Sequence, residues 1–80
     1  MKLLANELFG KNLQKIRKSR NLTQTQTVAQ MCTLGSSISR STYSIIELGR
    51  GNIFISDLVC LQKIFDVDYS EFFKDIPSHR

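Results

Sequence analysis

Eighty residues suffice for one small domain and leave no room for the separate cofactor and substrate layers of most enzymes. A hydrophobic fraction of 41% and a charged fraction of 22% exclude a disordered or fibrous chain. No apolar run approaches the roughly 18–20 residues that cross a bilayer, and the opening residues turn polar too early for a signal peptide. We therefore expect one soluble cytoplasmic domain over residues 1–80, with no membrane association.

The positive charge is concentrated near the N-terminus. The formal net charge is +4, and six of the 11 basic residues lie within residues 1–20 against the single acid Glu7. Residues 51–80 are mildly acidic instead. This asymmetry is compatible with a polyanionic partner on one side of the molecule, although the charge alone favours a solvated helix face.

A first helix is predicted over residues 7–19, where apolar side chains recur at helical spacing: Phe9, Leu13 and Ile16. Lysines occupy the opposite face and are expected to be solvated: Lys11, Lys15 and Lys18. Arg17 differs from them because it lies one turn from Leu13, at the edge of the apolar stripe. Gly10 is expected to weaken the first turn.

The second and third helices have clear start and stop signals. Thr23 and Gln26 form a capping box that opens the second helix, and Gly35 is suited to end it. Its apolar side is expected to comprise Val28, Ala29, Met31 and Cys32. Ser39 can cap a third helix that runs to about residue 48 and stops at Gly49.

A fourth helix is predicted over residues 56–65, with a core face of Leu58, Leu61, Ile64 and Phe65. Asp68 can cap a short fifth helix over residues 69–73, and Pro77 begins a frayed tail over residues 77–80. The predicted fold is therefore all-α, a compact bundle of five short helices. Apolar side chains near the end exceed the need of one short helix, so some of their surface is expected to be buried in a dimer interface, with packing in the core as the alternative: Tyr69, Phe72, Phe73 and Ile76.

Catalytic, metal and redox motifs are missing from the sequence. Cys32 and Cys60 lie far apart with no histidine near either, and both are expected to be buried free thiols. The one histidine, His79, falls in the expected tail with no nucleophile tied to it. We expect no enzyme, no cofactor and no metal.

A wheel at 100° per residue separates two faces of the third helix. Tyr43, Ile46 and Ser39 share the core side, and Glu47 lies at its edge. The side chains that point away are Arg40, Ser41, Ser44, Ile45 and Leu48. Arginine can bond guanine through two atoms, serine can bond any base, and isoleucine can meet a thymine methyl. The face therefore suits base reading, although it is also compatible with an ordinary polar surface.

Three segments resemble the phage repressor and Cro family of helix-turn-helix regulators, the XRE type. They are Leu22-Thr23-Gln24, the run from Ile38 to Gly49 (ISRSTYSIIELG), and Asn52, and the likeness covers residues 13–73. The connector is longer than in the commonest members and is similar to a branch with an extended second helix and turn. Thr27 and Val28 stand where the family has leucine followed by alanine.

The resemblance implies a lambda-repressor-like domain whose third helix enters the DNA major groove. Candidate base-reading residues are Arg40, Ser41, Ser44 and Ile45, and Ser39 is a further candidate DNA-binding residue. Candidate phosphate contacts are Thr23, Arg50 and Asn52. Gln24 either contacts phosphate or braces the third helix. The family also pairs the positions of Arg17 and Glu47 in a partly buried salt bridge, which gives Arg17 a structural role.

The sequence thus predicts a sequence-specific regulator of transcription, a repressor, that binds double-stranded DNA as a homodimer. The alternative is an antitoxin or anti-repressor component that acts mainly through a protein partner.

Overall fold

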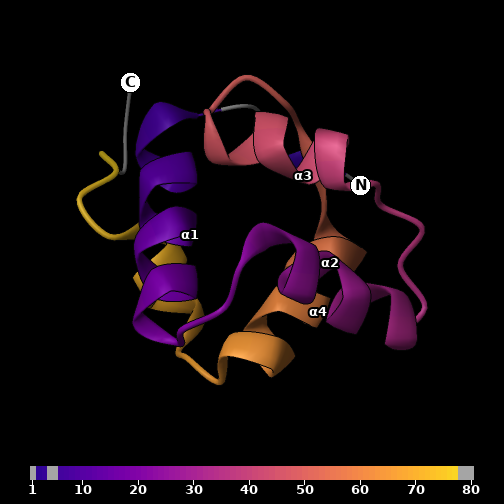
Figure 1. Ribbon diagram of the computed structural model, residues 1–80. Coiled ribbons are helices and arrows are strands. Elements are labelled where there is room, and N and C mark those ends of the chain that lie inside the picture. Colours follow the sequence, from indigo (N-terminus) through magenta and orange to yellow (C-terminus); the bar gives the residue numbers. More distant parts are fainter. Residues whose placement is uncertain (1, 4–5, 78–80) are drawn as a thin grey trace.

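The structure is a computed structural model that describes residues 2–3 and 6–77, and it is built mainly of helices (Figure 1). Four α-helices are present: α1 (Glu7–Ser19), α2 (Gln24–Thr33), α3 (Arg40–Glu47) and α4 (Ile55–Phe65). A short 3₁₀ helix, η1 (Tyr69–Phe73), follows them. Two strands of two residues each, β1 (Lys2–Leu3) and β2 (Ile53–Phe54), pair antiparallel. The chain is therefore mostly helical, as the sequence predicted.

Two predictions about the elements need correction. The fifth segment is a 3₁₀ helix rather than an α-helix, so the described residues form four α-helices and not five. Only five residues separate its cap Asp68 from Lys74, and the amide of Glu71 bonds the carbonyl of Asp68 three residues earlier, 3.0 Å away. The sequence also gave no sign of the β1–β2 pair, because each strand is too short to carry an alternating pattern.

Side-chain caps fix the starts of α2, α3 and η1, as the sequence indicated. The Thr23 hydroxyl accepts from the Gln26 amide while the Gln26 side chain accepts from the Thr23 amide, which completes the capping box. The Ser39 hydroxyl accepts from the Thr42 amide at 3.1 Å, and Asp68 caps η1. Asn6 caps α1 through the amide of Phe9. Because each cap anchors a turn, the loops that flank α3 have defined geometry.

The helix ends depend on backbone conformations that favour glycine. Gly35 has a φ of 99° after α2, and Gly49 has a φ of 78° after α3. A side chain at Gly49 would also collide with the start of α1, where the Cα of Glu7 lies 2.5 Å from the ideal Cβ position. The turn after α3 therefore packs directly on the first turn of α1.

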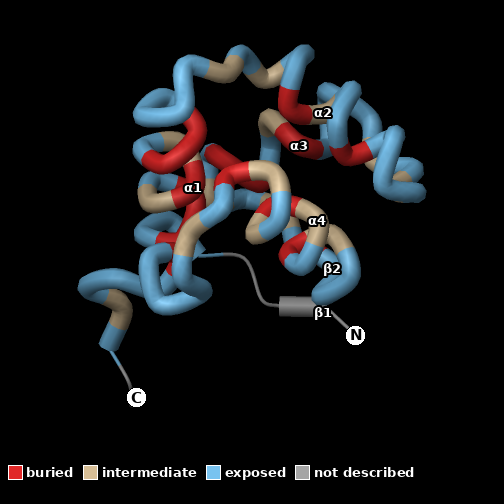
Figure 2. Tube along the Cα trace, turned by 90° about the horizontal axis from the view of Figure 1, so that it is seen from below, coloured by how far each residue is buried: buried red, intermediate tan, exposed pale blue. Residues whose placement is uncertain are grey.

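The core lies in the middle of the molecule, where the helices converge (Figure 2). The predicted apolar faces of α1 and α4 are buried there, with Ile64 only partly covered: Phe9, Leu13, Ile16, Leu58, Leu61 and Phe65. α3 contributes Tyr43 and Ile46, and η1 contributes Phe72. Asn12 attaches the C-terminal segment to α1, since its amide donates to the carbonyls of Phe72 and Lys74 at 3.1 and 2.8 Å.

The buried side of α2 differs from the predicted one. Met31 is buried, but Ala29 and Cys32 are exposed, and Val28 is only partly covered. Thr27, which was not among the predicted core residues, is buried in their place, because its hydroxyl donates to the carbonyl of Thr23 at 2.9 Å and so needs no water. The prediction that both cysteines are buried is also wrong, since Cys32 is exposed and Cys60 is half-buried.

Within the described residues, no helix has both the length and the apolar character that crossing a membrane requires. Most of the expected frayed tail is residues 78–80, which include His79 and lie outside the described residues. Pro77 itself is exposed.

Candidate nucleic-acid interface

α2 and α3 pack against each other and are joined by residues 34–39. Ser36 holds this connector through three hydrogen bonds. Its amide donates to the carbonyl of Met31 at 3.0 Å, and its hydroxyl donates to Asp57 Oδ1 of α4 at 2.8 Å. The Ser36 oxygen also accepts from the amide of Ile38. The connector is thereby tied to α4, a role that the sequence alone did not reveal.

α3 presents one buried and one exposed face. Tyr43, Ile46 and Glu47 are buried, whereas Ser39 is exposed, which corrects its predicted place on the core side. Ser39 is the N-cap, where the backbone has left the helical conformation and the wheel no longer holds. Four candidate base-reading side chains line one shallow hollow of about 440 Å³: Arg40, Ser41, Ser44 and Ile45.

The candidate hydroxyls at the helix starts have defined partners. Ser39 Oγ accepts from the Thr42 amide and donates to Thr42 Oγ1 at 3.0 Å. Thr23 Oγ1 accepts from the Gln26 amide and retains its own hydrogen for a donor bond. Thr23 therefore keeps a group that suits phosphate, while the Ser39 hydroxyl is engaged within α3.

Gln24 bonds Glu47 in this structure. Its side-chain amide nitrogen donates to Glu47 Oε1 at 3.0 Å, so the first residue of α2 is linked to the last residue of α3. Of the two roles that the sequence left open for Gln24, bracing α3 is the one that this geometry displays. The side-chain carbonyl oxygen of Gln24 does not bond Glu47, because a carboxylate has no proton to donate.

Arg17 is occupied by structural bonds at all three side-chain nitrogens. Nε lies 2.7 Å from Glu47 Oε2, Nη2 lies 3.1 Å from Glu47 Oε1, and Nη1 donates to the carbonyl of Leu22 at 2.8 Å. The side chains are 8% and 2% exposed. The hydrogen bond to Glu47 raises the pKa of Arg17 in spite of the opposing effect of burial. Arg17 thus joins α1 to α3, and each of its side-chain nitrogens is engaged in a bond within the chain.

Tyr43 lies under this ion pair. Its hydroxyl is buried and has no hydrogen-bond partner among the described residues. Burial raises the pKa of Tyr43 far above its usual value, and the nearby Glu47 carboxylate raises it further. The phenol therefore stays neutral and packs in the core from the buried face of α3.

Arg50 and Asn52 follow α3 in an exposed loop. The Arg50 amide donates to the carbonyl of Ile45 at 3.1 Å, which fixes the backbone and leaves the side chain in solvent. Neither residue lines the hollow on α3. They flank the candidate reading face at the end of α3, whereas Thr23 and Gln24 lie at the start of α2.

A second hollow, of about 210 Å³, brings α1 to the same surface. Lys11 and Gln14 line it together with Gln24 and Ser44. Ser44 belongs to both hollows, so it connects the candidate reading face with α1. The sequence pattern placed Lys11 on a solvated face, because a wheel of one helix contains no information on which other helix stands beside it.

No arrangement suited to metal binding occurs in the described part of the chain, where no three His, Cys, Asp or Glu side chains gather. No protein-family model, curated protein or solved structure matches the chain. Function has to be inferred from the surface around α3.

Proposed function

We propose that this protein is a sequence-specific double-stranded DNA-binding regulator of transcription, a repressor, that reads the major groove with α3. In this proposal the fold is a lambda-repressor-like helix-turn-helix domain that acts in the cytoplasm. The observation that carries the proposal is the outward face of α3, where Arg40, Ser41 and Ile45 are exposed in one hollow. Arginine can bond guanine, serine can bond a base of either base pair, and isoleucine can contact a thymine methyl group.

The rigidity of α3 supports the same proposal. Its end is held by Arg17 and Gln24 through Glu47, and its start is capped by Ser39. A reading helix that is already ordered loses little conformational freedom on binding. Base edges demand fixed donor positions, so such bracing favours specific over non-specific recognition.

The flanking residues fit a contact with the DNA backbone. Arg50 adds a cation in the loop after α3, and Thr23 adds a hydroxyl donor before α2. Phosphate contacts of this kind fix the register of a protein on the duplex, while base contacts carry the specificity. The formal net charge of +4 adds general attraction to a polyanion.

The length of α3 argues for a homodimer. Its eight residues span roughly 12 Å, so one copy reads only a few base pairs. Two copies on half-sites about one helical turn apart would double the number of contacts. We therefore include a near-palindromic operator in the proposal.

One observation favours a second candidate function. Ile45 and Leu48 are 46% and 59% exposed, and together they give the end of α3 an apolar character. Such a surface also suits a protein partner, as in an antitoxin or anti-repressor component. Stable copurification with a heterologous protein that covers α3 would favour this function over DNA reading.

Selection of bound sequences from random duplex DNA tests the proposal. We expect enrichment of a short motif and nanomolar affinity for it that falls steeply with salt. The substitution Ser41→Asp should abolish enrichment because it places a carboxylate against the duplex, whereas the exposed α1 change Lys15→Gln should preserve the motif. Recovery of sequences without any common motif would contradict the proposal.

A further inference from the structure

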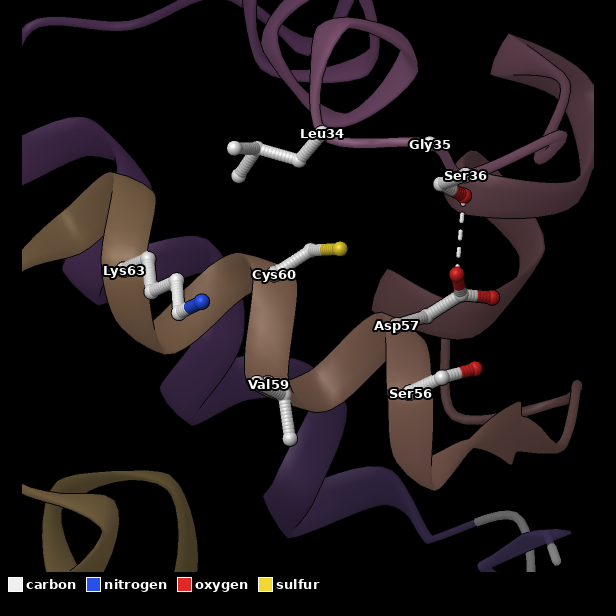
Figure 3. A pocket seen from close by; sticks show the side chains of 8 residues that line it. All are labelled: Leu34, Gly35, Ser36, Ser56, Asp57, Val59, Cys60 and Lys63. Carbon is white, nitrogen blue, oxygen red and sulfur yellow. Dashed lines mark hydrogen bonds between the residues drawn. The ribbon is translucent and has the colours of Figure 1, made fainter.

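A groove runs between the C-terminal end of α2 and the outward side of α4 (Figure 3). Its main part has a volume of about 380 Å³, and an adjoining hollow of about 340 Å³ shares two of its lining residues. We call it the α2–α4 groove and define it by Leu34, Asp57, Val59, Cys60, Lys63 and Ile64.

The α2–α4 groove leaves apolar side chains in contact with water. Leu34 is 47% exposed and Val59 is 36% exposed, and Ile64 is only partly covered. Burial of such surface against a partner is favourable at roughly 25 cal/mol per Å² of apolar area. The groove therefore has the composition of a surface that gains from being covered.

The charges of the groove are balanced along α4. Asp57 lies in the first turn of α4 and Lys63 in its last turn, six residues and roughly 9 Å apart along the axis. Cys60 lies midway between them along α4, and Asp57 and Lys63 are displaced around the helix by about 60° to either side of it, because three residues turn the helix by about 300°. With an acid at one end and a base at the other, two copies of α4 that run antiparallel place each acid opposite the base of the other copy.

We propose that the α2–α4 groove binds a second copy of this chain, with the two α4 helices antiparallel about a two-fold axis. Ser36 bonds Oδ1 of Asp57, so Oδ2 is the atom that faces Lys63 of the partner subunit in that arrangement, and the same contact repeats on the other side of the axis. The register that pairs these charges also sets Cys60 opposite Cys60 of the partner subunit, because residue 60 is the midpoint of 57 and 63. This register thus pairs Asp57 and Lys63 in both copies, and it places Cys60, which is uncharged, at the two-fold axis.

Other surfaces are less suited to self-association. The outward face of α1 carries Lys11 and Lys15 and would repel its own copy. The C-terminal aromatic residues are largely used within the chain, since Phe72 is buried and the Phe73 ring lies 5.8 Å from that of Phe9. Packing within the chain, rather than burial in a dimer interface, therefore accounts for much of the apolar surface of these residues.

The choice of a second copy over a different protein follows from the charge pattern. A groove with one acid and one base offers no net attraction to a strongly charged partner, whereas it matches itself in both contacts. The groove also contains none of the candidate DNA-binding residues, so self-association and the use of α3 are compatible.

Sedimentation equilibrium without DNA tests the interface directly. We expect the parent chain to dimerise and Lys63→Glu to weaken association roughly tenfold or more, because two like-charge contacts replace two favourable ones. Asp57→Lys combined with Lys63→Glu should recover much of the association, and Ser36→Ala, which removes the same bond between Ser36 and Asp57, is the control for the altered connector. Lys15→Glu, the same charge change on the outer face of α1, should leave it unchanged. Circular dichroism checks that each variant is folded.

Disulfide cross-linking gives a second readout that does not depend on the charge variants. With copper–phenanthroline as oxidant, the Cys32→Ser variant should form a covalent dimer through Cys60, whereas the Cys60→Ser variant should not. Cys32 is the more exposed thiol, so random collision predicts the opposite order.

Three outcomes would overturn the proposal. They are a monomeric parent chain at high concentration, a dimer that Lys63→Glu leaves intact, and cross-linking through Cys32 alone. The first would leave the groove to a different protein. Because no DNA is used, none of these outcomes bears on the role proposed for α3.

Discussion

Arg17 of α1 and Glu47 of α3 form a two-point ion pair that is almost completely withdrawn from solvent. Gln24 of α2 bonds the same carboxylate, so three helices meet at Glu47. The pair therefore does more than bridge two surfaces: it fixes the end of α3 against both α1 and α2. Its effect on stability is larger than that of an exposed salt bridge, because each charge has left water.

Glu47→Gln should lower the free energy of unfolding by about 3 kcal/mol. The substitution keeps the shape of the side chain but leaves the Arg17 cation buried without its counter-charge. Urea unfolding followed by circular dichroism measures the loss. A stability close to that of the parent would mean that water reaches Arg17 and screens it.

The coupling between the two residues can be measured separately. Arg17→Met removes the stranded cation, so the double variant Arg17→Met, Glu47→Gln should be more stable than the sum of the single losses implies. Strictly additive losses would show that the two side chains do not interact in solution.

The helices of this protein could be predicted from local signals in the sequence. Thr23, Ser39 and Gly49 mark boundaries through caps and left-handed turns that act within a few residues. The face of α3 followed from the wheel, with the exception of its cap. The contact between Arg17 and Glu47 was expected because the resemblance to a known family implied it, not because periodicity revealed it.

The features that the sequence did not reveal depend on long-range contacts. Ser36 bonds Asp57 across 21 positions, and neither residue stands out by type or spacing. Thr27 is buried in place of Ala29 and Cys32 because its hydroxyl finds a local acceptor, which a scale of hydrophobicity does not register. Lys11 joins the hollow beside α3 only because α1 and α3 pack closely.

Tyr43→Phe should change stability little at neutral pH, within about 1 kcal/mol, because the hydroxyl has no hydrogen-bond partner among the described residues. The difference should appear in alkali. Burial raises the pKa of Tyr43 in the folded chain, so the stability it contributes is present below the pKa of an unfolded tyrosine, about 10, and is lost as pH rises above it.

Urea unfolding at neutral pH and at about pH 11 compares the free energy of unfolding of the parent with that of the Tyr43→Phe variant. The parent should lose more stability between these conditions than the Tyr43→Phe variant. Equal losses would mean that the phenol ionises in the folded state at little cost.

Gly10→Ala should destabilise the protein by about 1–3 kcal/mol, although alanine is the better helix former. The ideal Cβ at this position lies 2.8 Å from the carbonyl oxygen of Ile46 and still closer to that of Glu47. Both atoms belong to the backbone of α3, so relief requires α1 and α3 to move apart.

Gly35→Ala is the matched control for this variant. Its Cβ meets no atom within 4 Å, and only the positive φ of 99° opposes it, at a cost of about 1–2 kcal/mol. The two variants differ in what they do to the ion pair. Gly10→Ala should also reduce the coupling between Arg17 and Glu47, whereas Gly35→Ala should preserve it. An unchanged coupling in Gly10→Ala would show that α1 accommodates the methyl group without separating from α3.

The last prediction separates reading from positioning on the proposed DNA surface. Arg40 is the first residue of α3, directly after the Ser39 cap, so the helix itself aims its side chain. Arg50 follows the left-handed Gly49 in a loop, and its side chain can turn toward phosphate without disturbing α3. Arg40→Ala should cost roughly 1–3 kcal/mol per half-site on the selected sequence and relax the preference at one base position.

Arg50→Ala should instead weaken binding to matched and scrambled duplexes alike and make the salt slope shallower by about one unit. Titrations of both variants against both duplexes at two salt concentrations measure the contrast, with Lys15→Ala as the control for losing one positive charge, because Lys15 lines neither hollow at α3. The difference follows from the chemistry of the two targets, because phosphates repeat along every duplex whereas a guanine edge occurs at one position. Equal losses on both duplexes for Arg40→Ala would mean that this side chain touches only phosphate, and the reading face would then have to be sought around Ser44 and Ile45.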